Sequence, residues 1–157
     1  MAERRTLQFE TLDAAVADAE QLLAKGYDPV GKWDLAQVCS HLAAWLKYPL
    51  DGYPPPPLVF RPAMWAMKHT VGPGMLDKVL STNAMPSVTT SAPGSVFPPG
   101  GDPTKAIRDF ADASTRWLAS NGANYPSPLF GMQPKDKITH LQRVHAAHHL
   151  SFLIPKQ

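Results

Sequence analysis

The residues of this sequence that are best suited to bind a metal ion or take part in a reaction are histidines clustered near the C-terminus. The stretch His145-Ala-Ala-His148-His149 lies in a segment with strong helical periodicity. Side chains four positions apart on a helix share one face, with Cβ atoms about 5–6 Å apart, so His145 and His149 can bind one ion. By i,i+3 spacing His148 could replace His149, and this alternative stays open.

A third ligand has to come from another helix, and His41 is the best candidate. It stands one turn before Trp45 and one turn after Gln37, so the helical period directs it to the core. Inward imidazoles need partners, because a buried unpaired polar group costs roughly 1–3 kcal/mol. The residues therefore predict a divalent metal site formed by His41, His145 and His149. The alternative is a metal-free network of buried histidines.

Three imidazole ligands leave an open coordination position, which is typical of catalytic rather than purely structural sites. Zinc peptidases with an H-E-x-x-H helix have a glutamate after the first histidine, but this sequence has Ala146 there, and no acidic residue follows Lys137. A thiol substrate needs no strong base, because metal binding itself deprotonates it. This favours thiol-related transfer over hydrolysis. Imidazole suits several divalent ions, of which we expect Zn or Ni.

Four helical segments must position these residues. An apolar stripe with helical spacing runs through each of them, and capping residues or prolines mark their ends. Asp34 and Gln37 predict a capping box at the start of the second segment, and Pro49 is expected to kink or end it. The predicted helices cover Leu12–Lys25, Leu35–Tyr48, the segment from Asp102-Pro103 to Asn121-Gly122, and Pro134–Leu153.

The prolines divide the rest of the chain. Two shorter helical pieces are predicted at Ala63–His69 and Met75–Leu80, separated by Gly72-Pro73-Gly74. Asp51–Pro57 reads as a stiff, extended connector, and Pro86–Gly101 as a long surface loop. The strand signal is weak throughout, and Leu7–Phe9 is the one segment expected to pair briefly with another.

Length and composition narrow the class of protein. The 157 residues suit one domain, residues 1–157, with a single core, and 44% hydrophobic against 18% charged residues is a soluble globular balance.

The net charge of the chain is only +2, without a run of basic residues, which predicts no nucleic-acid partner. No apolar run is long enough to span a bilayer, which predicts no membrane partner. The start MAERRTLQFE lacks the apolar stretch of a signal peptide, so we expect a cytoplasmic protein. Because Cys39 is the only cysteine, the chain cannot form an internal disulfide. Its apolar neighbours predict that Cys39 is a small buried side chain.

Two segments together resemble a known superfamily. The run from Trp33-Asp34-Leu35-Ala36-Gln37 to His41-Leu42-Ala43, followed by Phe130-Gly131 and the His145–Leu153 stretch, is similar to the DinB/YfiT-like superfamily. More specifically, it resembles an uncharacterised bacterial family of DinB-like proteins with W-[SD]-L-x-Q-x-x-x-H-L-A and H-x-x-H-H motifs. The resemblance implies an all-α fold, a four-helix bundle, here with an additional short broken helix and long Pro-rich loops. It also implies a divalent ion held by His41, His145 and His149.

The resemblance also bears on activity and partners. Some related members are thiol-dependent transferases and one is a maleylpyruvate isomerase, and related bundles often form homodimers. We therefore expect a metal-dependent, thiol-related transferase or hydrolase acting on a small molecule such as a low-molecular-weight thiol. The alternative is a non-catalytic metal-binding or stress-response module in which the ion or a histidine network is structural. Pro-rich segments at Pro54–Pro57 and Pro86–Pro103 could reshape the mouth of the pocket.

Overall fold

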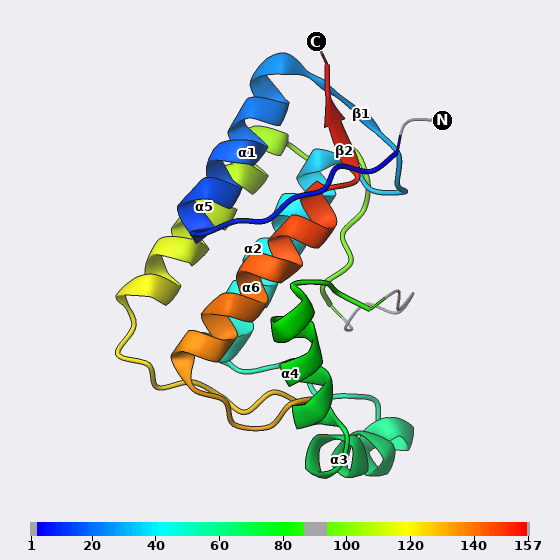
Figure 1. The fold of residues 1–157 in the computed structure, drawn as a ribbon, viewed down its shortest axis with the longest axis vertical. Helices are drawn as coiled ribbons and strands as arrows, with labels where there is room; N and C mark the ends of the chain where they lie inside the picture. Colours follow the sequence, from blue (N-terminus) through cyan, green and yellow to red (C-terminus); the bar gives the residue numbers. More distant parts are fainter. Residues whose placement is uncertain (1–2, 87–93, 157) are drawn as a thin grey trace.

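The computed structural model describes residues 3–86 and 94–156. The protein is mostly helical, as the sequence predicts, and it adds a small antiparallel sheet of two strands that the sequence does not predict (Figure 1). Residues 87–93 of the expected Pro86–Gly101 loop lie outside the described residues. In chain order the elements are α1 Leu12–Lys25, β1 Tyr27–Pro29, α2 Leu35–Asp51, the 3-10 turn η1 Leu58–Phe60, α3 Arg61–His69, α4 Gly72–Thr82, α5 Pro103–Ala119, α6 Lys135–Leu150 and β2 Leu153–Pro155.

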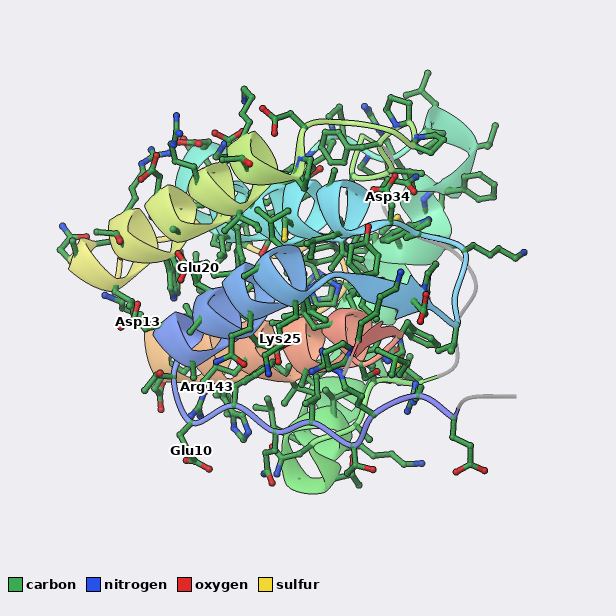
Figure 2. The ribbon with its side chains drawn as sticks, turned by 90° about the horizontal axis from the view of Figure 1, so that it is seen from above. Glu10, Asp13, Glu20, Lys25, Asp34 and Arg143 are labelled. Atoms are coloured by element: carbon green, nitrogen blue, oxygen red, sulfur yellow. The ribbon has the colours of Figure 1, made fainter. Side chains whose placement is uncertain are left out.

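The four long helices α1, α2, α5 and α6 pack around one hydrophobic core. Both α5 and α6 contact α1 and α2, so each helix buries its apolar stripe against two neighbours (Figure 1). Trp117 and Phe110 of α5 are the largest fully buried side chains. Asp13, Glu20 and Lys25, the three α1 residues labelled in Figure 2, are exposed. Within the described ranges, no helix is both long enough and apolar enough to cross a bilayer.

The start of α2 has the predicted capping box. The Asp34 side chain accepts from the backbone N–H of Gln37 at 2.8 Å, and the Gln37 side chain accepts from the backbone N–H of Asp34 at 3.1 Å. The same two side chains also hold the loop before α5. Asp34, labelled in Figure 2, accepts from the N–H of Gly100 at 2.8 Å, and the Gln37 amide donates to the carbonyl of Phe97 at 2.7 Å. Gln37 is therefore both a helix cap and an anchor for this loop.

The predicted end of the second helical segment at Tyr48 is wrong, because α2 continues to Asp51 with Pro49 inside it. A proline inside a helix leaves the carbonyl four residues earlier without its N–H donor. Here that carbonyl belongs to Trp45, and the side-chain amide of Gln142 on α6 donates to it at 2.8 Å. A side chain from the neighbouring helix thus replaces the missing backbone hydrogen bond.

The predicted end of the last helix at Leu153 is also wrong, since α6 ends at Leu150. The chain turns there and Leu153–Pro155 form β2, which pairs antiparallel with β1, Tyr27 opposite Pro155 and Pro29 opposite Leu153. Leu153 is fully buried, so the turn places an apolar side chain in the core. Leu7–Phe9 do not form the expected strand; Leu7 and Phe9 pack against the core instead.

The broken helical region forms α3 and α4, as predicted, but Gly72-Pro73-Gly74 begins α4 instead of lying between the two pieces. A proline fits the first turn of a helix because its missing N–H has no partner there. α4 packs on α6 through a second, smaller apolar cluster. Its buried members are Leu76, Val79, Leu141 and Val144.

We expect Gly72→Ala to destabilise the protein strongly and Gly74→Ala to leave it as stable or slightly more stable. A Cβ on Gly72 would lie 1.9 Å from the carbonyl oxygen of Leu129, so the backbone would have to move, whereas a Cβ on Gly74 meets nothing within 4 Å. Overpacking of this kind costs about 1–3 kcal/mol or more, while Ala is preferred to Gly inside a helix by up to about 1 kcal/mol. Urea denaturation of both variants measures the difference. Equal stability of the two would contradict the close approach at Gly72.

Candidate metal centre

The structure brings the three predicted histidines together. His41 comes from α2 and His145 and His149 come from α6, two helices in contact with each other. The Nε2 atom of His145 lies 3.1 Å from Nε2 of His41 and 3.0 Å from Nε2 of His149. One ligand nitrogen from each residue lies within 4.8 Å of the others, so the three are close enough to hold a metal ion. His41 and His145 are buried, and His149 is half-buried.

A hydrogen bond outside the cluster fixes the orientation of His41. Its Nδ1 lies 2.7 Å from the backbone carbonyl oxygen of Ser95. A carbonyl only accepts, so Nδ1 carries the proton and, in the neutral ring, Nε2 presents a lone pair to the cluster. Metal-binding histidines commonly donate their second ring N–H in this way, which fixes both tautomer and ring direction.

The contacts within the cluster are poorly suited to a hydrogen-bond network. Each ring nitrogen has a single in-plane position, which holds either a proton or a lone pair. The Nε2 of neutral His145 therefore cannot form two full in-plane hydrogen bonds, to His41 and to His149, although both nitrogens lie near 3 Å. A cation at the centre satisfies three lone pairs at once. A tetrahedral zinc ion bound at about 2.0–2.1 Å would separate its nitrogen ligands by about 3.3 Å, close to the 3.0–3.1 Å of the two pairs that involve His145.

Burial keeps the three imidazoles neutral. It lowers the pKa of His41 to about 4, although the hydrogen bond to Ser95 opposes this shift, and it lowers the pKa of His149 to about 2. The pKa of His145 is also held well below its ordinary value, by burial first and by the neighbouring histidines second. A metal ligand must be unprotonated. At neutral pH the three rings are therefore already in the form that binds an ion.

Two tryptophans form walls around the cluster. Trp33 stacks on the ring of His149, with centroids 5.1 Å apart and planes within 7°, and meets His41 edge-on at 4.9 Å. Trp45 meets His145 edge-on at 5.2 Å. Trp65, which is exposed on α3, and Phe130, which packs against the α4–α6 cluster, do not belong to these walls.

The remaining histidines lie outside the cluster. His148 is half-buried, and its ring packs against those of His149 and Phe152. Of the two alternatives on α6, the structure therefore places His149 rather than His148 with His41 and His145. His69 is exposed, and its ring lies 4.9 Å from that of Trp65.

Comparison with known proteins gives one family. The model of the family described as "Protein of unknown function (DUF1569)" matches residues 1–156. The chain belongs to this family. No curated protein and no solved structure matches the chain.

The side chains in the cluster limit the chemistry that this DUF1569 member can carry out there. Among the described residues, no Asp, Glu or Cys side chain joins the three-histidine group. The feature that sequence reasoning missed is the carbonyl of Ser95, because a backbone oxygen supplied by a loop 54 positions away leaves no side-chain signal. The arrangement offers three neutral nitrogen ligands and aromatic walls, without a carboxylate base within the group.

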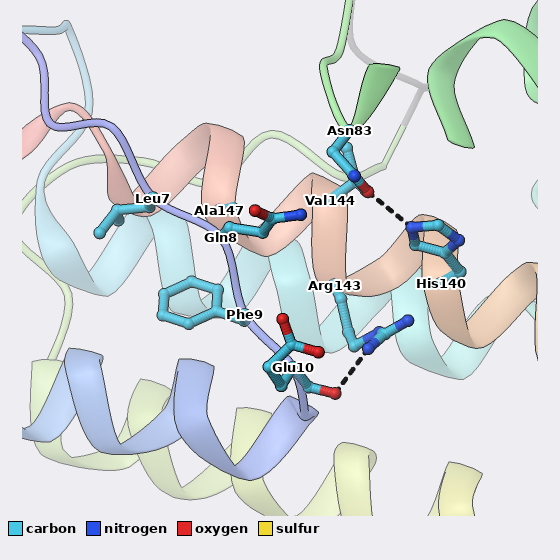
Figure 3. A pocket seen from close by; sticks show the side chains of 9 residues that line it. All are labelled: Leu7, Gln8, Phe9, Glu10, Asn83, His140, Arg143, Val144 and Ala147. Atoms are coloured by element: carbon cyan, nitrogen blue, oxygen red, sulfur yellow. Dashed lines mark hydrogen bonds between the residues drawn. The ribbon is translucent and has the colours of Figure 1, made fainter. Parts of the chain in front are cut away.

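A separate pocket of about 220 Å³ lies on the other side of α6 (Figure 3). At 3.6 residues per turn, His140 and Ala147, which line the pocket, lie on the face of the helix opposite His145 and His149. The polar side chains here bond to neighbouring segments: His140 Nε2 lies 2.6 Å from Asn83 Oδ1, and Arg143 donates to the backbone carbonyl of Glu10. None of the three clustered histidines lines this pocket, so it is not their substrate pocket.

We expect Cys39 of this family member to resist thiol reagents in the folded state. The side chain is fully buried on α2, and burial, reinforced by the negative charge of Asp18, raises the pKa of its thiol to about 12. The thiolate is the reactive form, so little of it exists at pH 8. Labelling with a maleimide-type or disulfide reagent should be slow in buffer and fast in denaturant. Rapid labelling of native protein would contradict the buried position.

Proposed function

We propose that this protein is a DinB-like four-helix bundle that binds one divalent ion through His41, His145 and His149. The observation that carries the proposal is the convergence of three Nε2 atoms, two pairs of them at 3.0–3.1 Å, from α2 and α6. The packing of α1, α2, α5 and α6 around one core is what a four-helix bundle requires. Three nitrogen ligands suit Zn or Ni, in line with the resemblance seen in the sequence.

We further propose that the site is catalytic and acts on a small molecule, with a low-molecular-weight thiol as the favoured substrate class. A bound divalent ion would supply Lewis acidity and deprotonate a coordinated thiol. His41, His145 and His149 would hold the ion with an open position, and the carbonyl of Ser95 would keep His41 in the correct tautomer. The absence of a carboxylate from the described group supports a substrate that needs no strong protein base.

Elemental analysis of the purified protein tests the metal site directly. We expect about one equivalent of Zn, Ni or a similar ion per chain, and stripped protein should regain one equivalent when titrated with Zn²⁺ or Ni²⁺ in a calorimeter. Failure to take up either ion stoichiometrically would overturn the proposal and favour a metal-free network of buried histidines.

A second measurement separates catalysis from a structural role, since three ligands that join α2 to α6 would also suit a metal staple. Metal-loaded and stripped protein are compared in a screen of small thiols with electrophilic acceptors, and the denaturation midpoint of both forms is recorded. Metal-dependent turnover with a small change in midpoint supports the enzyme. No turnover, together with a large drop in midpoint on metal removal, would support the non-catalytic module instead.

A further inference from the structure

Exposed apolar side chains cover η1 and the start of α3. Leu58, Val59, Phe60 and Trp65 are 74%, 80%, 58% and 66% exposed, and neither element has a buried residue. We call these four residues the η1–α3 surface. α3 lies at the end of the molecule farthest from both termini and stands out beside α4 (Figure 1). An apolar surface that contributes nothing to the core points to an interaction with something outside the chain.

The charged residues that η1 and α3 themselves carry are basic, and the next acidic residue after them along the chain, Asp77 of α4, pairs with Lys137 of α6. The sequence has no acidic residue between Asp51 and Asp77, while Arg61 and Lys68 both belong to α3. Arg61 is exposed and directly follows Phe60, and Lys68 is half-buried in the last turn. The η1–α3 surface is therefore apolar and cationic, without a neighbouring carboxylate in the sequence from Gly52 to Leu76.

We propose that the η1–α3 surface binds an anionic lipid membrane as a peripheral contact. A short helix with Trp, Phe and Leu beside Arg and Lys has the composition of segments that lie in the membrane–water interface. Tryptophan and phenylalanine insert at the level of the headgroups, and each basic residue is attracted by anionic lipid. The proposal departs from the prediction of no membrane partner made from the sequence, because that prediction rested on the lack of a spanning run and a peripheral contact needs none.

A second copy of the chain fits this surface less well. Pairing two η1–α3 surfaces would place Arg61 and Lys68 of one copy near those of the other, with no acidic residue in the same stretch to compensate. An anionic membrane satisfies both the apolar and the cationic parts. Charge complementarity therefore selects the membrane.

Vesicle cosedimentation of the full chain tests the proposal. The protein should bind phosphatidylcholine vesicles that contain about 30% phosphatidylserine, bind pure phosphatidylcholine weakly, and lose affinity as salt rises. Phe60→Ser should reduce the partition coefficient roughly tenfold or more, since burial of a phenylalanine side chain is worth about that much. The matched control is Tyr125→Ser, because Tyr125 is a 54%-exposed aromatic residue in the loop before α6. It should bind like the unaltered protein.

Tryptophan fluorescence gives an independent readout. Of the four tryptophans, Trp65 is exposed, Trp33 and Trp45 are half-buried beside the histidines, and Trp117 is fully buried. Only Trp65 belongs to the η1–α3 surface, so vesicle binding should shift the emission to the blue through Trp65. Trp65→Phe should remove the shift and keep most of the binding. Equal loss of binding in Phe60→Ser and Tyr125→Ser, or no binding to anionic vesicles, would overturn the proposal. Concentration-dependent dimerisation without lipid that Phe60→Ser abolishes would overturn it in favour of a second copy.

Discussion

His41→Ala is expected to lower the affinity for Zn²⁺ or Ni²⁺ by more than about a hundredfold, because loss of a ligand should exceed the ten- to hundredfold loss typical of the residues that support ligands. Its ring supplies the only α2 nitrogen among the three that converge. His145→Ala should be at least as severe, since His145 Nε2 lies within 3.1 Å of both partners. Calorimetric titration of stripped protein, or competition with a chromophoric chelator, measures the loss.

The matched control for this prediction is His148→Ala. His148 lies on the same helix, directly before His149, but its ring packs on Phe152 and takes no part in the convergence. Its removal should leave metal affinity unchanged, with a circular dichroism spectrum like that of the other variants. If His148→Ala abolished binding while His41→Ala retained it, the assignment of the three ligands would be wrong.

Trp117→Ala is expected to lower the free energy of unfolding by about 3–5 kcal/mol, as for other large-to-small changes in a core. The side chain is fully buried on α5, and its Nε1 donates to the hydroxyl of Thr139 on α6 at 2.9 Å. The substitution would open a cavity between helices and leave Thr139 without this partner. Urea denaturation, which gives the midpoint and the slope, measures the change.

Trp65→Ala is the control for the core prediction, because it is the same substitution at a position 66% exposed on α3. A surface change of this kind should alter stability by no more than about 0.5 kcal/mol. Similar losses in the two variants would mean that the core does not lie where the structure places it, or that α3 is covered in solution.

The sequence predicted the helices and the histidine cluster where local physics decides the outcome. The capping box of Asp34 and Gln37 depends on residues three positions apart, and the structure has it as predicted. The i,i+4 spacing of His145 and His149 places two rings on one side of a helix in any helical protein. The choice of His41 as their partner needed only the direction of its apolar stripe, and the three do lie together.

The errors arise where distant parts of the chain decide the outcome. Pro49 ends no helix, because Gln142, far along the sequence, supplies the missing donor. Leu153 leaves the helical pattern because β1 and the core offer a strand partner and a buried site. The Ser95 carbonyl that orients His41 has no sequence signal, since every residue carries one. The family match adds no function to these residues, because the DUF1569 family is itself described as one of unknown function.

The hydrogen bond from Gln142 to the carbonyl of Trp45 sets the axial alignment of two antiparallel helices. His145 stands three residues after Gln142, and His41 stands four residues before Trp45. The Gln142–Trp45 and His145–His41 contacts are therefore about one helical turn apart along the two helices. Sliding α6 along α2 by one turn would move the rings about 5.4 Å apart and separate the nitrogens. The carbonyl of Trp45, which Pro49 leaves without a backbone donor, is reached by Gln142 only at this axial position of α6 relative to α2. Through this hydrogen bond, Pro49 favours the axial alignment of α2 and α6 in which the histidine nitrogens lie close together.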